Sequence, residues 1–322
     1  MNDMRKKLVW ILSALLTLLF LFIAITRLEW RSFISLIKGF EVKYLIGATI
    51  VYFFSYVIRA LRIRFLIRSS SISFRKILSI SLLHNFFNRI LPARTGELSL
   101  LYLLYKYSEV PIRDSSPILI ILRIYDLIAS LMLISIAGLA LYSKVFSFVS
   151  IFIFLSLLIL IAFFPVTILS CFNKLLLRMN FNNKYTSKLF DLFKYYINHM
   201  TYLQSWGVRF FLLITSLLIW ILIILFFIFL MLGLDFYKNF WDTVFATSIA
   251  NFSWILPING IGGFGTMELG WVAAFGILNY SIDEVLKVAI FVNICAFLCT
   301  IIFTTYPIII LGFGRKKGIE FH

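Results

Sequence analysis

The chain has 322 residues, of which 62% are hydrophobic and only 14% are charged, and its formal net charge is +16. Soluble domains contain about 25% charged residues, so this composition excludes an ordinary water-soluble protein. The positive charge does not indicate a nucleic-acid partner, because the Lys and Arg residues stand in short clusters between apolar runs and leave no basic folded domain to hold a groove. We therefore expect an all-α polytopic membrane protein.

Long apolar runs predict about six full transmembrane helices. Most of these runs reach or exceed about 18 apolar residues, the length that indicates a membrane-spanning helix. They do not alternate between polar and apolar residues, as the strands of a membrane barrel do. In chain order the predicted helices lie near residues 8–27, 44–66, 115–140, 145–171, 209–233 and 286–313.

Two further apolar stretches, residues 76–108 and 241–282, are interrupted near their middles by Pro and Gly, which predicts broken or re-entrant helical hairpins. The main basic clusters all fall on one side of the membrane only if each hairpin enters and leaves by the same face. The positive-inside rule makes that side cytoplasmic. We expect a multi-pass protein of the cell (plasma) membrane, with cytoplasmic N- and C-termini.

The two interrupted stretches share a sequence pattern. Residues 85–92 read NFFNRILP and residues 251–257 read NFSWILP, and each proline is followed by a Thr-x-Glu-Leu tetrad. Inverted repeats with broken helices are a recurrent plan of secondary transporters, whose substrate site lies near the membrane midplane. We therefore predict a single membrane domain over residues 1–322, arranged as an inverted repeat of about 1–143 and 144–314. A cytoplasmic amphipathic linker is predicted near 172–208.

The tetrads contain the most informative candidate residues, Glu97 and Glu268. Each is expected in the first turn of the returning half of its hairpin, with Thr95 and Thr266 as N-caps. Each carboxylate could serve only to stabilise a helix start. Ionisable groups inside a membrane are costly, however, and usually face a cavity or a partner, which favours a substrate-binding role.

Arg89 and Arg94 flank the proline at the tip of the first hairpin. Guanidinium groups at this place could bind a lipid phosphate, or they could pair with Glu97 or reach the membrane surface. Asn88 and Asn259 complete the predicted substrate-binding set. Asn259 begins a glycine-rich segment that lacks the Lys-Ser/Thr ending of a P-loop, so we expect it to supply unwound backbone that lines a cavity.

Arg123 and Asp126 stand three residues apart within one predicted helix, so they lie on the same face. We interpret them as a structural ion pair that neutralises two costly charges, and a site role for Arg123 remains open if Glu97 competes for it. The three His and three Cys residues show no metal-ligand spacing, and no nucleophile–base pair is visible. No metal, no cofactor and no catalytic residue are predicted.

Two motifs carry a family resemblance. Residues 88–97, NRILPARTGE, with residues 123–126, RIYD, resemble the first signature of one membrane family, and residues 262–268, GGFGTME, resemble its second. That family is the transmembrane, flippase-like region of lysylphosphatidylglycerol synthases and their stand-alone relatives. The resemblance implies that this region moves aminoacylated phospholipid between leaflets, whereas a separate domain of the full-length synthases transfers the amino acid from tRNA.

The chain departs from the family pattern at several positions where the family often carries charge. Arg is frequent where Leu100, Met267 and Asn293 stand, and an acidic residue is frequent where Leu122 stands. The second half is therefore poorer in charge than the family pattern. The transferase domain is absent from the sequence, so we expect a transporter-like protein and no enzyme.

The prediction for function is a flippase-like lipid translocase. It would move a phospholipid, including aminoacylated phosphatidylglycerol, or a lipid-linked head group between leaflets. The two arginines of the first hairpin would attract the phosphate, and the two glutamates would engage a cationic group or exchange protons. One alternative is a membrane scaffold that presents lipid to a separate lipid-modifying enzyme. Another is a membrane transferase, which would need a large extracytoplasmic loop that is not seen. The expected partners are anionic or aminoacylated membrane lipids, and a homo-oligomer remains open.

Overall fold

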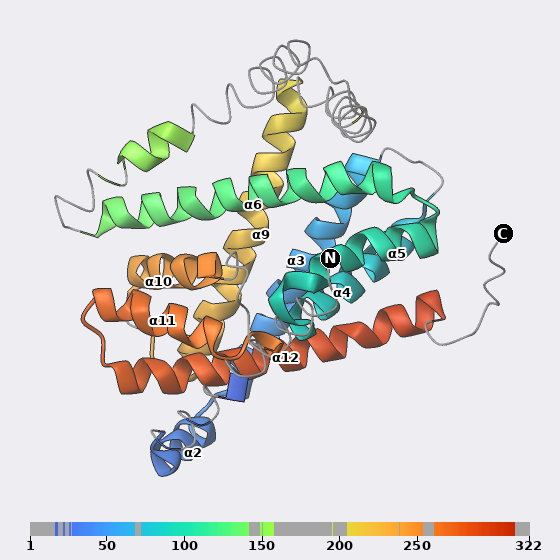
Figure 1. Cartoon of the computed structure of the whole chain (residues 1–322). Helices are drawn as coiled ribbons and strands as arrows, with labels where there is room; N and C mark the ends of the chain where they lie inside the picture. The colour runs from blue at the N-terminus through green and yellow to red at the C-terminus, as the bar shows by residue number, and fades with distance from the viewer. Residues whose placement is uncertain are drawn as a thin grey trace.

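The computed structural model describes residues 28–67, 72–141, 151–157, 205–237, 239–253 and 261–312, with the isolated residues 17, 18, 22, 26, 149 and 195 (Figure 1). In this part of the chain all regular secondary structure is helical. The protein is therefore an all-α polytopic membrane protein, as its composition predicts.

Among the described residues, four helices are long and apolar enough to cross a membrane. They are α3 (Val42–Ile67), α6 (Ile112–Ala140), α9 (Trp206–Gly233) and α12 (Ile282–Leu311). Their ends differ by at most four residues from four of the predicted spans, which are thereby confirmed. The predicted helices 8–27 and 145–171 and the predicted linker 172–208 lie largely outside the described residues.

The first hairpin consists of α4 (Phe74–Ile90), the 3-10 helix η1 (Pro92–Leu98) and α5 (Ser99–Ser108). The break falls at Leu91, whose backbone is extended with ψ 131° because the residue before a proline is disfavoured in helical conformation. A Cβ atom on Gly96 would lie 2.4 Å from the Cα of Asn88 and from the carbonyl oxygen of Phe87, so only glycine lets η1 press so closely onto α4.

One detail of the first hairpin was predicted wrongly. Thr95 lies inside η1 and is no N-cap, and Glu97 precedes α5 instead of standing in its first turn. Proline suits the first position of a helix, so η1 begins at Pro92. Helix η1 then continues directly into α5, which leaves no non-helical residue to serve as a side-chain cap. The cap position of α5 is held by Leu98, whose backbone is itself helical.

The second hairpin consists of α10 (Phe240–Ser253), η3 (Ile261–Gly263) and α11 (Thr266–Ile277). Gly262 and Gly265 have φ values of 70° and 90°, a region that side chains disfavour, so the glycines permit the turn. Glu268 stands in the first turn of α11, as predicted. Thr266 is the first helical residue and Gly265 is the N-cap, so the prediction of a threonine cap is wrong here as well.

The long helices and the hairpins pack in matching pairs. Helix α3 packs along α9, α4 packs against α12, and α10 packs against α6. In Figure 1 both hairpins lie between α6 and α12. In the predicted repeat, α3 corresponds to α9, α4 corresponds to α10, and α6 corresponds to α12. The contact of α4 with α12 therefore corresponds to the contact of α10 with α6, and α3 packs against its own counterpart, α9. Each hairpin therefore packs against the final long helix of the other predicted half.

The outer surface of the helices is apolar. On α3 the exposed side chains include Val42, Ile46, Ile50 and Phe54, which recur every four residues along one face. On a soluble protein such a stripe would need a partner, whereas in a bilayer it faces lipid acyl chains. The short helix α2 (Trp30–Lys38) lies at one end of the bundle, next to the start of α12, where Glu29 pairs with Lys287 at 3.1 Å.

Candidate functional site

A cavity of about 310 Å³, here called the central cavity, is enclosed by both hairpins and all four long helices. Its volume lies near the lower end of the range for small-molecule pockets, which suits a head group better than a whole lipid. Its polar lining comprises Arg59, Asn85, Asn88, Arg89, Glu97, Arg123, Asp126, Asn251 and Thr300, and its aromatic lining comprises Tyr52, Tyr56, Trp220, Phe226 and Phe227.

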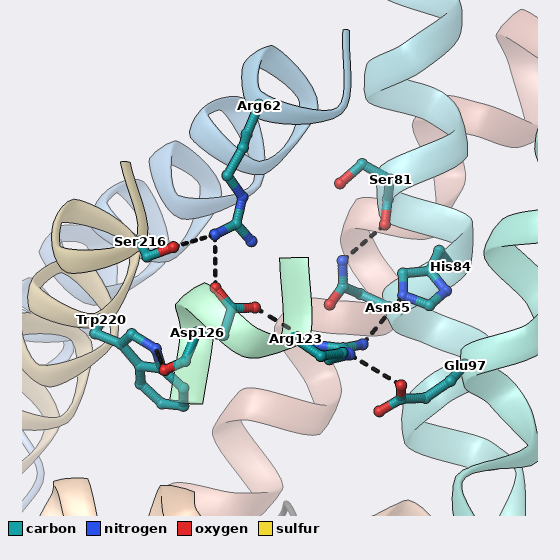
Figure 2. A network of polar contacts seen from close by, with 9 residues as sticks. All are labelled: Arg62, Ser81, His84, Asn85, Glu97, Arg123, Asp126, Ser216 and Trp220. Carbon is teal, nitrogen blue, oxygen red and sulfur yellow. Dashed lines mark hydrogen bonds and ion pairs between the residues drawn. The ribbon is translucent and has the colours of Figure 1, made fainter. Parts of the chain in front are cut away.

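Arg123 of α6 connects the two carboxylates of this lining. Its Nε lies 2.9 Å from Glu97 Oε2, and its Nη1 lies 3.6 Å from Asp126 Oδ2. Figure 2 shows Arg123 and Glu97 pointing toward one another from α6 and the first hairpin. The predicted pair of Arg123 with Asp126 is thus present, but Glu97 is the closer partner of Arg123.

Asp126 has its own closer partner in Arg62 of α3, whose Nη1 lies 2.6 Å from Asp126 Oδ1. Arg62 also donates to the hydroxyl of Ser216 on α9, and Trp220 of α9 donates to the backbone oxygen of Asp126 at 2.9 Å. These contacts join three long helices around one buried carboxylate (Figure 2). Charge-assisted hydrogen bonds of this kind fix the geometry of the cavity wall.

His84 of α4 supports the same network from the hairpin side. Its Nδ1 lies 3.0 Å from the hydroxyl of Ser99, and its Nε2 lies 3.5 Å from Arg123 Nη2. The imidazole is buried and does not line the central cavity. We interpret it as a packing residue that helps to position Arg123.

The second hairpin meets the first through Asn293 of α12. Arg89 of α4 donates to the side-chain oxygen of Asn293 and, at 3.2 Å, to its backbone oxygen. The side-chain amide of Asn293 in turn donates to Glu268 Oε1 at 2.7 Å. The other carboxylate oxygen of Glu268 accepts from the backbone N–H of Gly265 at 2.8 Å. Glu268 therefore both caps α11 and reaches Arg89 through one amide.

The predicted substrate-binding residues occupy different places. Arg89, Asn88 and Glu97 line the central cavity. Glu268 is fully buried behind the cavity wall and is not among its lining residues. Arg94 lies in η1, but its side chain is outside the part that the structure describes, and Asn259 lies outside the described residues altogether.

Sequence reasoning missed Arg59, which stands on α3 and lines the central cavity. Arg59 makes no hydrogen bond or ion pair with any residue in the described ranges. Arg59 falls within the predicted span 44–66, but its position near the end of that span also suits a basic residue that orients the chain. The signal was available, because an ionisable residue inside a membrane-spanning helix indicates a functional site by default.

Two asparagines, Asn85 and Asn251, were also missed as site residues, although they begin the matching motifs of the two hairpins. Both line the central cavity. The buried Asn88 Oδ1 and Asn251 Nδ2 have no hydrogen-bond partner in the described part of the chain. Both side chains line the cavity, and these two atoms are shielded from solvent, so a ligand would reach them once the side chains turn.

The geometry is that of a charged, partly aromatic cavity between two broken hairpins in a membrane protein. A comparison with known families matches residues 10–303 to the family described as the lysylphosphatidylglycerol synthase TM region. No curated protein and no solved structure matches the chain. The match includes both hairpins and most of α12, and it implies a membrane function connected with lipids. The chain therefore belongs to the family of lysylphosphatidylglycerol synthase transmembrane regions.

Proposed function

We propose that this protein is a lipid translocase that receives a phospholipid head group in the central cavity while the acyl chains stay in the bilayer. The observation that carries this proposal is the lining of the cavity, which brings guanidinium and carboxylate groups of the first hairpin, α3 and α6 together with an asparagine of the second hairpin among aromatic rings. Charged groups are costly inside a membrane, and a polar cavity for a head group gives them a function.

The movement that we propose is a rocking of two inverted repeats, near residues 1–143 and 144–314, which opens the cavity to one leaflet and then to the other. The exchanged packing of α4 on α12 and of α10 on α6 supports this arrangement. So does the spacing of two contacts, from Glu97 to Arg123 over 26 residues and from Glu268 to Asn293 over 25 residues.

The surroundings of the protein follow from the same proposal. It would lie in the cell membrane with both termini in the cytoplasm, as the distribution of basic residues predicts. The family match covers a transmembrane region, which supports transport and not group transfer as the role of this chain. Its ligands would be membrane lipids, and a separate lipid-modifying enzyme could supply them.

The test is head-group translocation in proteoliposomes, with plain and aminoacylated phosphatidylglycerol as substrates. We expect movement that depends on the protein and that falls about tenfold in Glu97→Gln, which corresponds to the loss of one charge-assisted contact. The physical reason is that Arg123 loses its closest partner and then holds the phosphate too firmly to release it. Glu284→Gln, the same change at an exposed position near the start of α12, should move lipid at the wild-type rate.

Two outcomes would redirect the proposal. Absence of movement for every lipid, in protein that stays folded, would favour the alternative of a membrane scaffold that presents lipid to a separate enzyme. Movement that is equal in wild type and in Glu97→Gln would keep the translocase but place its site away from the first hairpin.

A further inference from the structure

We propose that the central cavity selects a head group with one net negative charge and no amine, namely a phosphate diester with a hydroxylated substituent, and that Arg59 receives the phosphate. The inference deepens the proposed function and rests on it for the identification of the ligand as a lipid. It runs against the simplest expectation from the family description, which would be a lipid that carries a lysyl group.

The carboxylates at the cavity are already occupied. Glu97 is paired with Arg123 at 2.9 Å, and Asp126 is paired with Arg62 at 2.6 Å. A cationic amine could reach either carboxylate only by displacing a guanidinium group. Removing Arg62 from the buried Asp126 leaves that charge uncompensated, which is strongly unfavourable, and the same cost applies in smaller measure to the partly buried pair of Glu97 and Arg123. Among the described residues, the cavity therefore offers no unpaired carboxylate to an aminoacyl ammonium group.

Glu268, behind the cavity wall, is balanced in the same way. Its carboxylate accepts from Asn293, which in turn accepts from Arg89. Arg89 is thus the cation nearest in this chain of contacts to the Glu268 carboxylate, and the neutral amide of Asn293 lies between them. An amine from the cavity cannot reach Glu268, because the side chain is fully buried.

The remaining charge belongs to Arg59. In and directly behind the cavity, the described residues include four arginines and three carboxylates, and each carboxylate has an arginine assigned to it by the contacts above. Only Arg59 is left without a hydrogen bond or an ion pair in the described ranges. One surplus positive charge matches the single negative charge of a phosphate diester.

A guanidinium group is well suited to that ligand. Its N–H donors form a fixed fork that can bind two phosphate oxygens at once. Arg59 is partly buried on a membrane-spanning helix, and the carboxylate that attracts it, Asp126, is already paired with Arg62, so a bound phosphate would neutralise the charge of Arg59.

The uncharged part of the lining indicates the rest of the head group. Asn88 Oδ1 is a buried acceptor and Asn251 Nδ2 is a buried donor, and neither has a partner in the described part of the chain. A hydroxyl group both donates and accepts, so a glycerol or a similar polyol would satisfy the two atoms once the asparagine side chains turn toward the cavity. The substrate class is therefore an anionic phospholipid with hydroxyl groups, of which phosphatidylglycerol is the simplest example.

The test is a binding measurement on the whole protein in detergent, with native mass spectrometry of bound phosphatidylglycerol, phosphatidylcholine and lysyl-phosphatidylglycerol. We expect phosphatidylglycerol to bind at least about tenfold more tightly than the other two lipids, because only it carries a net negative charge. Arg59→Gln should remove this preference, and Arg59→Lys should keep part of it. Arg64→Gln, on the same helix but exposed and outside the cavity, should keep all of it.

A second variant keeps the test sharp if Arg59→Gln does not fold. Glu97→Gln adds one net positive charge to the cavity, so it should bind phosphatidylglycerol more tightly than the wild type does. If Glu97 instead bound an amine, the same variant would bind lysyl-phosphatidylglycerol more weakly, and that result would overturn the inference.

The wild type alone can also decide the question. Binding of lysyl-phosphatidylglycerol as tight as that of phosphatidylglycerol would overturn the inference, as would full competition by inorganic phosphate, which would mark a site for a free anion and not for a lipid. Phosphatidylglycerol binding that depends on Arg59 but is accompanied by no translocation would defeat the translocase and leave the binding site standing. Translocation without lipid preference would defeat only the inference.

Discussion

Glu268 accepts a hydrogen bond of 2.7 Å from the side-chain amide of Asn293, which lies 25 residues later in the chain. Glu97 accepts from Arg123 in the same way, at 2.9 Å and over 26 residues. Both carboxylates stand just after the break of a hairpin, and both partners stand on the long helix that follows it. In the first predicted half the carboxylate is thus bound by a guanidinium group, whereas in the second it is bound by a neutral amide.

The position of Asn293 leads to a prediction about stability. Replacing it in Asn293→Leu leaves the Glu268 carboxylate without its side-chain donor and removes a contact of Arg89, both inside the protein. We expect a loss of about 3 kcal/mol in the free energy of unfolding, since a buried charged group then lacks a partner. Thermal unfolding in detergent measures this loss. Thr305→Leu, an exposed polar-to-apolar change on the same helix, should leave the unfolding midpoint unchanged.

The buried pair of Arg62 and Asp126 predicts a non-additive pair of variants. Arg62→Leu or Asp126→Leu alone should each cost about 3–5 kcal/mol, because each leaves the opposite charge buried and unpaired. The double variant should be more stable than either single variant, since neither charge remains. Unfolding midpoints of the three proteins decide the matter, and strictly additive losses would show that the two side chains do not stabilise one another.

Gly96 sets the position of Glu97, and this gives a third prediction. An added methyl group would lie 2.4 Å from backbone atoms of α4, so Gly96→Ala should push η1 away from α4 and draw Glu97 from Arg123. We expect a loss of about 1–3 kcal/mol in stability and reduced lipid movement. Gly276→Ala is the matched control, because nothing lies within 4 Å of its added Cβ atom. Equal behaviour of the two variants would contradict the tight packing of η1.

The proposed orientation is tested by cysteine labelling in a variant that lacks the three native cysteines. Glu109→Cys, in the exposed turn after α5, should react only with reagent on the cytoplasmic side, and Ser281→Cys, in the exposed turn before α12, only with reagent outside. The two positions follow the first and the second hairpin, which open to opposite faces in an inverted repeat. Labelling of Glu109→Cys only from outside would exclude that topology.

The elements of the fold could be predicted well from the sequence, because their causes are local. The apolar length of α9 is visible in the sequence itself, and the breaks of the hairpins follow from Pro92 and from the glycines before Thr266. The helix caps were less predictable. Whether Thr95 becomes a helix cap depends on where the helix resumes after Pro92. Because η1 begins at Pro92 itself, Thr95 lies inside a helix and not at its start.

The partners within the site could be predicted only in part. Glu97 and Arg123 both belong to the first family signature, and the competition of Glu97 with Asp126 for Arg123 could be anticipated. The contact of Arg62 with Asp126 spans 64 residues, and that of Arg89 with Asn293 spans 204 residues. Such pairs depend on which helices pack together, and no local pattern determines that. Arg59 is difficult to predict for a different reason. A basic residue near the end of a membrane span can orient the protein in the membrane or bind a ligand, and the sequence alone does not distinguish the two roles.

The exchanged packing of the hairpins has a consequence for biosynthesis. Arg89 enters the membrane early, yet its partner on α12 is translated 204 residues later, which takes about 10–40 s at ordinary ribosome speeds. During that interval the first hairpin lacks the helix against which it packs in the finished protein. A polypeptide that stops short of α12 would leave this arginine uncovered in the bilayer, where membrane proteases can recognise an unfinished chain.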